Sequence, residues 1–452
     1  MSEKPTTPKY FDGMEKLGKT HKHFLIIATI AYFFDQMDMG MFSYIAPSIM
    51  ADLGYDQSHL AIISSMSFWG MAFGGIFAGW LGEKMGRKNG LLAIIAIFSI
   101  SQFVNIFARN VYVFCFFRFL VGFGAVGMLV IAMTYISEMM PSKTRGKYQA
   151  LTIACGSLGL PLTAGLAAAV APLGAHTWRL LFIIGALGIL LIPFGVKYLR
   201  ESPRWLVSKG RIAEAEAIVS ECTGEPCDLS SEAGNAHNAA KSLSMWQAVK
   251  IMFDKRYLRT TSVVLLLAIG ITVGNFFLAN WGTIYMLDNG WDYQIALLAS
   301  MLIIFGNPLG DLLASKISDK GGRKIPIVCC CIVAGLGYIG IGLLIKTRAP
   351  YIIVNLIRGL CVAASMTMLW TYCAESFPTK VRSNISGIVL SIARCLVACV
   401  TFAVPILYAS FGVVGVYTIN AMMFIIPAII VLLFGKSTAG KTLEEIEAEA
   451  HA

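Results

Sequence analysis

Charge is the scarcest property of this sequence. Only 14% of its 452 residues are charged, whereas 57% are hydrophobic. A soluble protein of this length needs far more charge to cover its surface, so most side chains must face lipid or other helices. The composition therefore excludes the soluble globular classes and predicts an integral membrane protein.

The motifs of enzymes, metal sites and disulfide frameworks are also missing from the sequence. We find no nucleotide-binding loop, metal-ligand spacing or nucleophile constellation, so we expect neither enzymatic activity nor a cofactor or metal. The 11 cysteines are scattered, and most lie inside apolar blocks, where a thiol behaves as a small hydrophobe. The N-terminus lacks a short apolar region followed by a small-residue cleavage site, so we expect no signal peptide.

Long apolar blocks are what the sequence has in abundance. About twenty residues cross a bilayer core, and about twelve blocks reach this length. The expected spans are 22–49, 58–81, 90–108, 111–137, 148–172, 179–199, 259–287, 294–316, 325–346, 350–373, 384–409 and 412–435. We predict an all-α integral membrane fold of 12 transmembrane helices in two pseudo-symmetric six-helix bundles.

The net charge of +10 reports topology rather than a nucleic-acid partner. When alternate loops are assigned to alternate sides, most of the 36 Lys and Arg residues fall on one side, which the positive-inside rule makes cytoplasmic. The outer ones are Arg109, Arg179, Lys346 and Arg348. We expect a monomer in the cell inner membrane with both termini in the cytoplasm, and the lipid bilayer as its surroundings.

The longest hydrophilic interval divides six spans from six. The predicted organisation is a cytoplasmic N-terminus (1–21), an N-terminal bundle (22–199), a cytoplasmic linker with short helices (200–257), a C-terminal bundle (258–435) and a cytoplasmic tail (436–452).

The two halves repeat each other in register. Gly79–Lys88 follows the second span and Asp319–Lys324 follows the eighth, and both end in Gly-Arg-Lys. The fourth and tenth spans each contain an Arg and end in Glu, Pro and Arg at matching spacing. Internal repeats of this kind indicate a transporter with its substrate site near the midplane, between the repeats.

These segments resemble the major facilitator superfamily over nearly the whole chain. The loop Gly-x-x-x-(Asp/Glu)-(Arg/Lys)-x-Gly-Arg-(Lys/Arg) is typical of that superfamily, with Glu83 here where Asp is commoner. Glu201–Leu206 (ESPRWL) resembles the segment after the sixth span of sugar porters, and Gly440–Ile446 resembles their tail. The resemblance implies a secondary transporter that works by alternating access on a small-molecule substrate.

Two carboxylates lie deep in the first span. Asp35 and Asp38 are spaced i, i+3, which puts them on one helix face, and charge at this depth is costly enough to indicate function. The surrounding FDQMDMG resembles the acidic motifs of aromatic acid/proton symporters and niacin permeases, which implies a role in coupling and substrate handling. The alternative is that one Asp lies near the outer interface or makes a static salt bridge.

Two intramembrane arginines are candidates to work with these carboxylates. Arg118 begins the fourth span and is predicted to exchange partners with a proton-carrying Asp, or else only to tie helices together. Arg394 lies midway along the eleventh span and is a candidate to bind a substrate carboxylate in bidentate fashion, or else to balance a buried acid. Arg358 lies nearer a span start and is interpreted as structural.

A set of charged residues at the inner helix ends is predicted to gate the transporter. The Glu…Arg pairs are interpreted as latches between helices that hold an outward-facing state. The set comprises Glu83, Arg87, Lys88, Glu138, Arg145, Asp319, Arg323, Lys324, Glu375 and Arg382.

Aromatic and amide side chains in the seventh, eighth and tenth spans are candidates to line a small-ligand cavity. They are Asn275, Asn280, Trp281, Tyr285, Asn307, Trp370 and Tyr372. Asp311 is a further intramembrane carboxylate, near the inner end of its span.

The substrate class follows from one absence and two features. Sugar porters carry two glutamines in the seventh helix where this chain has Ile269–Asn275 (IGITVGN). This absence, the acidic pair and Arg394 favour proton symport of a small organic or aromatic carboxylate. The alternatives are transport of a sugar, polyol or other neutral molecule, export rather than import, and a membrane sensor that transports nothing.

Overall fold

A computed structural model describes residues 10–11, 14, 17–141, 144–229, 245–317, 324–377 and 382–435, and all their regular structure is helical. Eleven of these helices are long and apolar enough to cross a membrane. The longest, Ile385–Phe434, has 50 residues and is interrupted by Gly412 at φ 64° and ψ −175°, so it supplies two crossings. Ten single crossings and this double one make the twelve predicted from the sequence.

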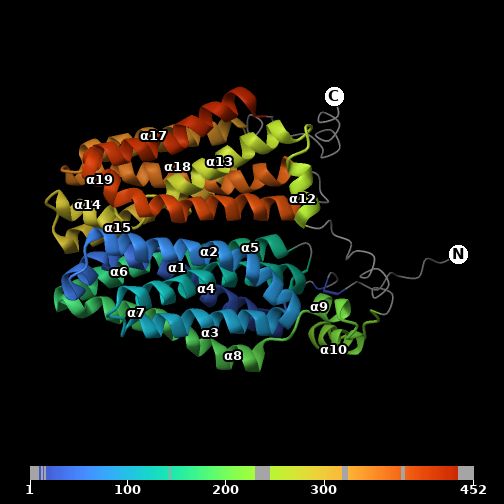
Figure 1. The fold of residues 1–452 in the computed structure, drawn as a ribbon. Coiled ribbons are helices and arrows are strands. Elements are labelled where there is room, and N and C mark those ends of the chain that lie inside the picture. Colours follow the sequence, from blue (N-terminus) through green and yellow to red (C-terminus); the bar gives the residue numbers. More distant parts are fainter. Residues whose placement is uncertain are drawn as a thin grey trace.

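The crossings form two bundles that lie side by side (Figure 1). The N-terminal bundle contains α1 (Lys19–Leu53), α2 (Gln57–Met85), α3 (Arg87–Asn105), α4 (Val111–Met139), α5 (Arg145–Ser157), α6 (Gly159–Val170), α7 (Trp178–Ala186) and α8 (Leu191–Tyr198). The C-terminal bundle contains α13 (Leu258–Phe276), α14 (Gly282–Asp288), α15 (Tyr293–Ile304), α16 (Gly306–Ile317), α17 (Lys324–Leu344), α18 (Arg348–Glu375) and α19 (Arg382–Phe434).

Three short helices connect the bundles at one end of the molecule, on the right in Figure 1. They are α9 (Pro203–Ser208), α10 (Ile212–Thr223) and α12 (Met245–Met252). We call this end the linker end, and the opposite one, with the turns at Gly54 and Gly290, the loop end.

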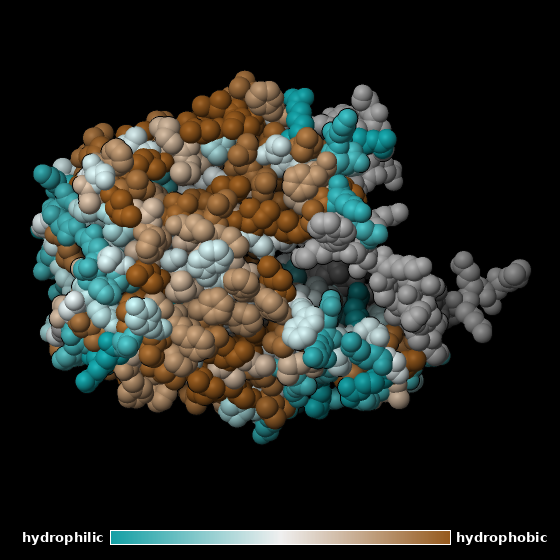
Figure 2. Space-filling view, in the orientation of Figure 1, coloured by the Kyte–Doolittle hydropathy of each residue, from teal (hydrophilic) through white to brown (hydrophobic). Residues whose placement is uncertain are grey.

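The surface of the molecule matches a bilayer. Figure 2 shows hydrophobic residues around the middle of the bundles and hydrophilic residues at both ends. Large apolar side chains of both bundles are exposed, among them Phe107 at 69%, Phe116 at 59% and Ile406 at 63%. Exposed apolar surface on this scale is stable only in lipid. The predicted all-α multi-span membrane fold is thereby confirmed.

A glycine makes the sharp turn between α2 and α3. Gly86 has φ 94° and ψ 165°, a backbone conformation that essentially only glycine adopts. Glu201 Oε1 accepts hydrogen bonds from the backbone N–H groups of Arg87 (2.7 Å), Lys88 (3.1 Å) and Ser202 (2.9 Å). Burial raises the pKa of Glu201, although these three hydrogen bonds favour its charged form. The carboxylate thus satisfies N–H groups at the start of α3 that have no partner within the helix.

Substitution of Gly86 by alanine should lower the thermal stability of the purified protein. A Cβ atom at this position would overlap Glu201 Oε2, and the required φ is strained for any L-residue. We expect a loss of about 1–3 kcal/mol, measured as a lower unfolding temperature in detergent. Gly79→Ala is the matched control, because a Cβ there meets no atom within 4 Å and the position is helical. Equal unfolding temperatures for the two variants would contradict the assignment.

Candidate functional site

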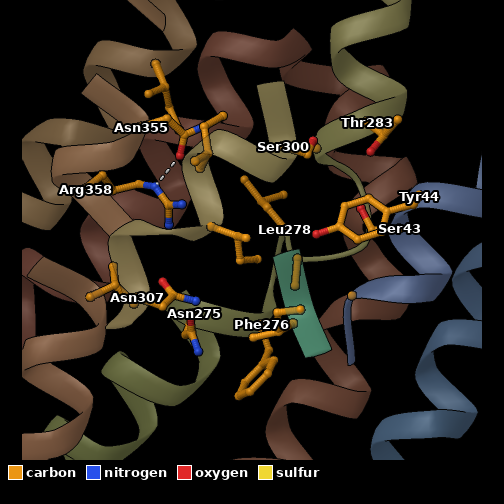
Figure 3. Close-up of a pocket in the computed structure, with 18 of the residues that line it drawn as sticks. Ser43, Tyr44, Asn275, Phe276, Leu278, Thr283, Ser300, Asn307, Asn355 and Arg358 are labelled. Atoms are coloured by element: carbon orange, nitrogen blue, oxygen red, sulfur yellow. Dashed lines mark hydrogen bonds between the residues drawn. The ribbon is translucent and has the colours of Figure 1, made fainter. Parts of the chain in front are cut away.

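A cavity of about 300 Å³ lies where the two bundles meet. The N-terminal bundle contributes residues of α1 and α6, and the C-terminal bundle contributes residues of α13 to α19, so the cavity is shared by both repeats (Figure 3). Its polar lining residues are Gln36, Ser43, Tyr44, Asn275, Thr283, Ser300, Asn307, Tyr338, Tyr351, Asn355, Arg358 and Tyr417. We call it the central cavity.

The seventh crossing is broken where it lines this cavity. Helix α13 ends at Phe276 and α14 begins at Gly282, with turns between them. The break brings Leu278 and Ala279 into the lining beside Asn275. Irregular backbone at membrane depth is tolerated only where it is buried in protein or faces a cavity, which identifies this crossing as part of the site.

Arg358 supplies the positive charge of the central cavity. Its Nε donates to Asn355 Oδ1 at 2.7 Å and its Nη1 donates to the Tyr338 hydroxyl at 2.7 Å. The Tyr338 hydroxyl in turn donates to the carbonyl of Gly274 at 3.1 Å. Among the residues that the structure describes, no carboxylate forms an ion pair with Arg358. The guanidinium is therefore held by neutral groups, and its charge is available to a ligand.

A second cavity of about 190 Å³ adjoins the central cavity on the side of the linker end. The two share Gln36, Leu160, Asn275, Ile304, Asn307 and Val362 in their linings. We call the second cavity the vestibule. Its lining includes Asp311 and Trp370, both exposed, whereas Tyr44 and Thr283 of the central cavity are buried. The pair of cavities is accordingly open toward the linker end.

The loop end is closed by contacts between the bundles. The Tyr293 hydroxyl donates to the carbonyl of Tyr44 at 2.6 Å and lies 3.0 Å from the Ser48 hydroxyl. Ser65 Oγ on α2 donates to the carbonyl of Ala398 on α19 at 2.6 Å. Access to the central cavity from this side would require these hydrogen bonds to break.

Asp38 and Arg118 form a buried ion pair within the N-terminal bundle. The Arg118 Nη1 to Asp38 Oδ1 distance is 2.7 Å, and the side chains are 4% and 1% exposed. Gln102 Nε2 also donates to Asp38 Oδ1 at 2.7 Å, and Arg118 Nε donates to Ser67 Oγ at 3.0 Å. Removal of one partner of such a pair leaves an uncompensated buried charge, so each of these two side chains compensates the buried charge of the other.

Asp35 makes no hydrogen bond to Asp38 or Arg118 and is bonded instead to its neighbour Gln36. Its Oδ2 accepts from Gln36 Nε2 at 3.1 Å, and its Oδ1 has no hydrogen bond to a described residue. Because Gln36 lines both cavities, it connects the buried Asp35 carboxylate to the substrate path. The two carboxylates, which are spaced i, i+3 on α1, therefore have different hydrogen-bond partners.

Arg394 lies behind the cavity wall. Its guanidinium is 4.6 Å from the centre of the Phe276 ring, and its Nη1 donates to Met71 Sδ at 3.2 Å. Phe276 lines the central cavity, but Arg394 does not. Its charge also interacts with that of Asp35 across the interface between the bundles.

The predicted gating residues gather at the linker end in the N-terminal bundle. Arg87 forms a two-nitrogen contact with Glu138, with Nη2 to Oε1 at 3.0 Å, and so ties α3 to α4. Lys88 Nζ donates to the carbonyl of Val196, and Glu83 is exposed while its carbonyl accepts from Trp205 Nε1. In the C-terminal bundle, Lys324 begins α17 and Glu375 ends α18. Asp319, Arg323 and the side chains of Arg145 and Arg382 lie outside the described residues.

The predicted substrate residues divide between lining and packing positions. Asn275 and Asn307 line both cavities, and Trp370 lines the vestibule. The others are not in either lining: Asn280, Trp281, Tyr285, Tyr372 and Arg394. All four of the uncharged ones are buried.

Sequence reasoning missed the contribution of Asn355 and Arg358. Arg358 was assigned a structural role because it lies near a span start. It lies ten residues into α18, which begins at Arg348, and ten residues rise about 15 Å. The i, i+3 spacing of Asn355 and Arg358 is the signal that could have found the pair, because it places an amide beside the guanidinium on one helix face.

Comparison with known proteins is consistent with this arrangement. Residues 25–450 match the family described as "Sugar (and other) transporter". The chain is 27% identical to the inner membrane metabolite transport protein YdjE of Escherichia coli, covering 96% of this chain and 97% of that protein. It is 25% identical to the niacin transporter NiaP of Acinetobacter baylyi, covering 95% and 97%. A structure of the E. coli xylose transporter XylE in a partially occluded inward open conformation matches with a TM-score of 0.76 at 20% identity, covering 94% of this chain and 100% of that one.

Proposed function

Because this chain belongs to the sugar (and other) transporter family, we propose that it carries a small organic or aromatic carboxylate together with protons, by alternating access. The observation that carries the proposal is the guanidinium of Arg358 in the central cavity, held by Asn355 and Tyr338. Guanidinium groups bind carboxylates through paired hydrogen bonds, and in a water-poor cavity such charge-assisted bonds are strong. The relative NiaP, named as a niacin transporter, acts on a molecule with this group.

The ion pair of Asp38 and Arg118 supports the proton-coupled part of the proposal. When Asp38 is ionised, it neutralises Arg118 inside the N-terminal bundle. Uptake of a proton by Asp38 removes this attraction and releases the guanidinium to other partners, such as the Ser67 hydroxyl that it already contacts. A protonation event of this kind changes the packing of α1 against α4, and these helices belong to the bundle that must move for access to alternate.

The distribution of charge supports an orientation with the linker end in the cytoplasm, as the positive-inside rule predicts. In that orientation the vestibule opens to the cytoplasm, and the hydrogen bonds of Tyr293 close the outer side. The protein then functions as a monomer, with the site formed between its own two bundles.

Transport of a neutral polyol or sugar is the second candidate. Four amide side chains in the lining of the central cavity favour it, because amides hydrogen-bond hydroxyl groups: Gln36, Asn275, Asn307 and Asn355. A relative at 26% identity is named as the major myo-inositol transporter IolT of Bacillus subtilis. A neutral substrate offers no opposite charge to Arg358, which is why we rank this candidate second.

Uptake into proteoliposomes distinguishes the two candidates. With an inward proton gradient, we expect accumulation of labelled benzoate or nicotinate above the equilibrium level, and no competition by a hundredfold excess of myo-inositol or xylose. A protonophore should reduce accumulation to the equilibrium level. Accumulation of the polyols in place of the carboxylates, or accumulation that a protonophore leaves unchanged, would contradict the proposal.

A further inference from the structure

The vestibule carries a charge opposite to that of the central cavity. The carboxylate of Asp311 lines the vestibule, and the guanidinium of Arg358 lines the central cavity. We propose that the vestibule binds a positively charged nitrogen, so that the carboxylate substrate of the proposed function is a zwitterion, with an amine, quaternary ammonium or pyridinium group. This inference rests on the proposed function and adds a second subsite to it.

The Asp311 carboxylate is held in place but not neutralised. Its Oδ1 accepts a hydrogen bond from Thr367 Oγ1 at 2.6 Å, which joins α16 to α18. No Lys or Arg side chain in the described part of the chain forms an ion pair with it. Asp311 also lies one turn after Asn307, which lines both cavities, so its position follows the path of the substrate.

Aromatic side chains complete a site suited to a cation. Tyr32 from α1 and Trp370 from α18 line the same 190 Å³ space as Asp311 and Thr367. The faces of Tyr and Trp rings attract ammonium and other organic cations, most strongly where water is sparse. Tyr32 belongs to the N-terminal bundle and Trp370 to the C-terminal bundle. A cation bound between these rings would contact the two halves at once, as a transported substrate must.

The spacing of the two charges agrees with a ligand that is passed between neighbouring subsites. Arg358 and Thr367, the partner of Asp311, lie nine residues apart on α18, a rise of about 13 Å. A ligand that moves from Arg358 toward the linker end therefore enters the vestibule next. A nonpolar or anionic end would meet the Asp311 carboxylate there, at a cost in desolvation or repulsion.

An isosteric pair of ligands tests the inference. 4-(Trimethylammonio)butanoate and 5,5-dimethylhexanoate have the same shape and carboxylate, but only the former carries a positive nitrogen. We expect the purified full-length protein to bind the former at least about tenfold more tightly in titration calorimetry. One carboxylate–cation contact and cation–π interactions together account for a difference in affinity of this size. Asp311→Asn keeps an acceptor for Thr367 but removes the charge. This substitution should abolish the preference, because it weakens the binding of the zwitterion and leaves the binding of 5,5-dimethylhexanoate unchanged.

Asp288→Asn provides the matched control. Asp288 lies at the loop end and likewise accepts a hydrogen bond from a hydroxyl, that of Tyr408, but it lines neither cavity. It should leave both affinities unchanged. Equal affinity of the unsubstituted protein for the two ligands overturns the inference, as does an equal loss for both ligands in Asp311→Asn, which would indicate a structural or proton-binding role. Binding of neither carboxylate, in contrast, contradicts the proposed function itself.

Discussion

Substitution of Asp38 by asparagine should abolish proton-driven accumulation of the substrate while leaving substrate exchange intact. Asparagine keeps the shape of the side chain and an oxygen that can accept from Arg118 and Gln102, but it cannot take up or release a proton. If Asp38 carries the coupled proton, an inward proton gradient no longer drives uptake above the equilibrium level. Counterflow, which needs only binding and reorientation, should persist. The measurement is labelled substrate uptake into proteoliposomes, with and without a gradient.

Two further variants separate coupling from folding. Asp38→Asn leaves the Arg118 charge buried without a counterion, which can cost about 3–5 kcal/mol. The double variant Asp38→Asn/Arg118→Gln removes both charges, so it should recover thermal stability but not accumulation. Asp35→Asn removes a carboxylate whose only hydrogen bond to a described residue comes from Gln36, and it should destabilise the protein less. Full gradient-driven accumulation by the Asp38→Asn variant would exclude Asp38 as the essential proton carrier.

Substitution of Arg358 by glutamine should remove the preference of the protein for carboxylates. Each hydrogen bond to a charged group contributes about 1.5–3 kcal/mol, so the loss of a guanidinium–carboxylate contact should weaken binding by roughly 10- to 100-fold. Benzoate and benzamide form a matched pair, because they share a ring and differ in charge. We expect the variant to lose affinity for benzoate in titration calorimetry and to bind benzamide as the unsubstituted protein does.

Arg394→Gln is the control for this experiment. Arg394 is the other deep arginine of the C-terminal bundle, but it lies behind the Phe276 ring and outside the central cavity. We expect it to change benzoate affinity less than Arg358→Gln does. Arg358→Lys should recover only part of the affinity, because an ammonium group does not reproduce the paired geometry of a guanidinium. A larger loss of benzoate affinity in Arg394→Gln than in Arg358→Gln would indicate that Arg394 binds the carboxylate, as the sequence alone predicted.

The two arginines show how far sequence reasoning reaches. Both were visible as cations within apolar spans, and depth along a span was the only criterion for choosing between them. Arg394 lies midway along its span, and Arg358 lies nearer a start. The direction in which each side chain points depends on the rotation of α18 and α19 about their axes. That rotation is set by packing against helices distant in sequence, which no local pattern records.

The seventh crossing makes the same point for the neutral residues. Four candidates were assigned to one apolar block, 259–287, as though it were a continuous helix. The turns between Phe276 and Gly282 change the direction of the chain, so Asn275 lines the cavities whereas Trp281 and Tyr285 pack into the core. The sequence contains no proline at this break, so no helix-breaking proline predicted it. Only the cavity beside it explains why irregular backbone is tolerated there.

The glycine turn at Gly86 is an intermediate case. Its motif was recognisable from the sequence, as was the segment that contains Glu201. Their contact was not, because 114 residues separate Glu201 from its hydrogen-bond donor Arg87. Recognition of two motifs thus located the linker-end junction without revealing that one holds the other in place.

The sequence by itself determined that this protein spans a membrane about twelve times, that its two halves repeat, and that acids lie at depth in its first span. These features are local, because lipid requires each crossing to satisfy its own backbone and to cover it with apolar side chains, residue by residue. Only the tertiary structure decided that Asp38 pairs with Arg118, that Arg358 and Asp311 line adjoining cavities, and that these cavities open at the linker end. Those features depend on how separate helices pack and rotate against one another, and their interaction energies arise between residues far apart in the chain.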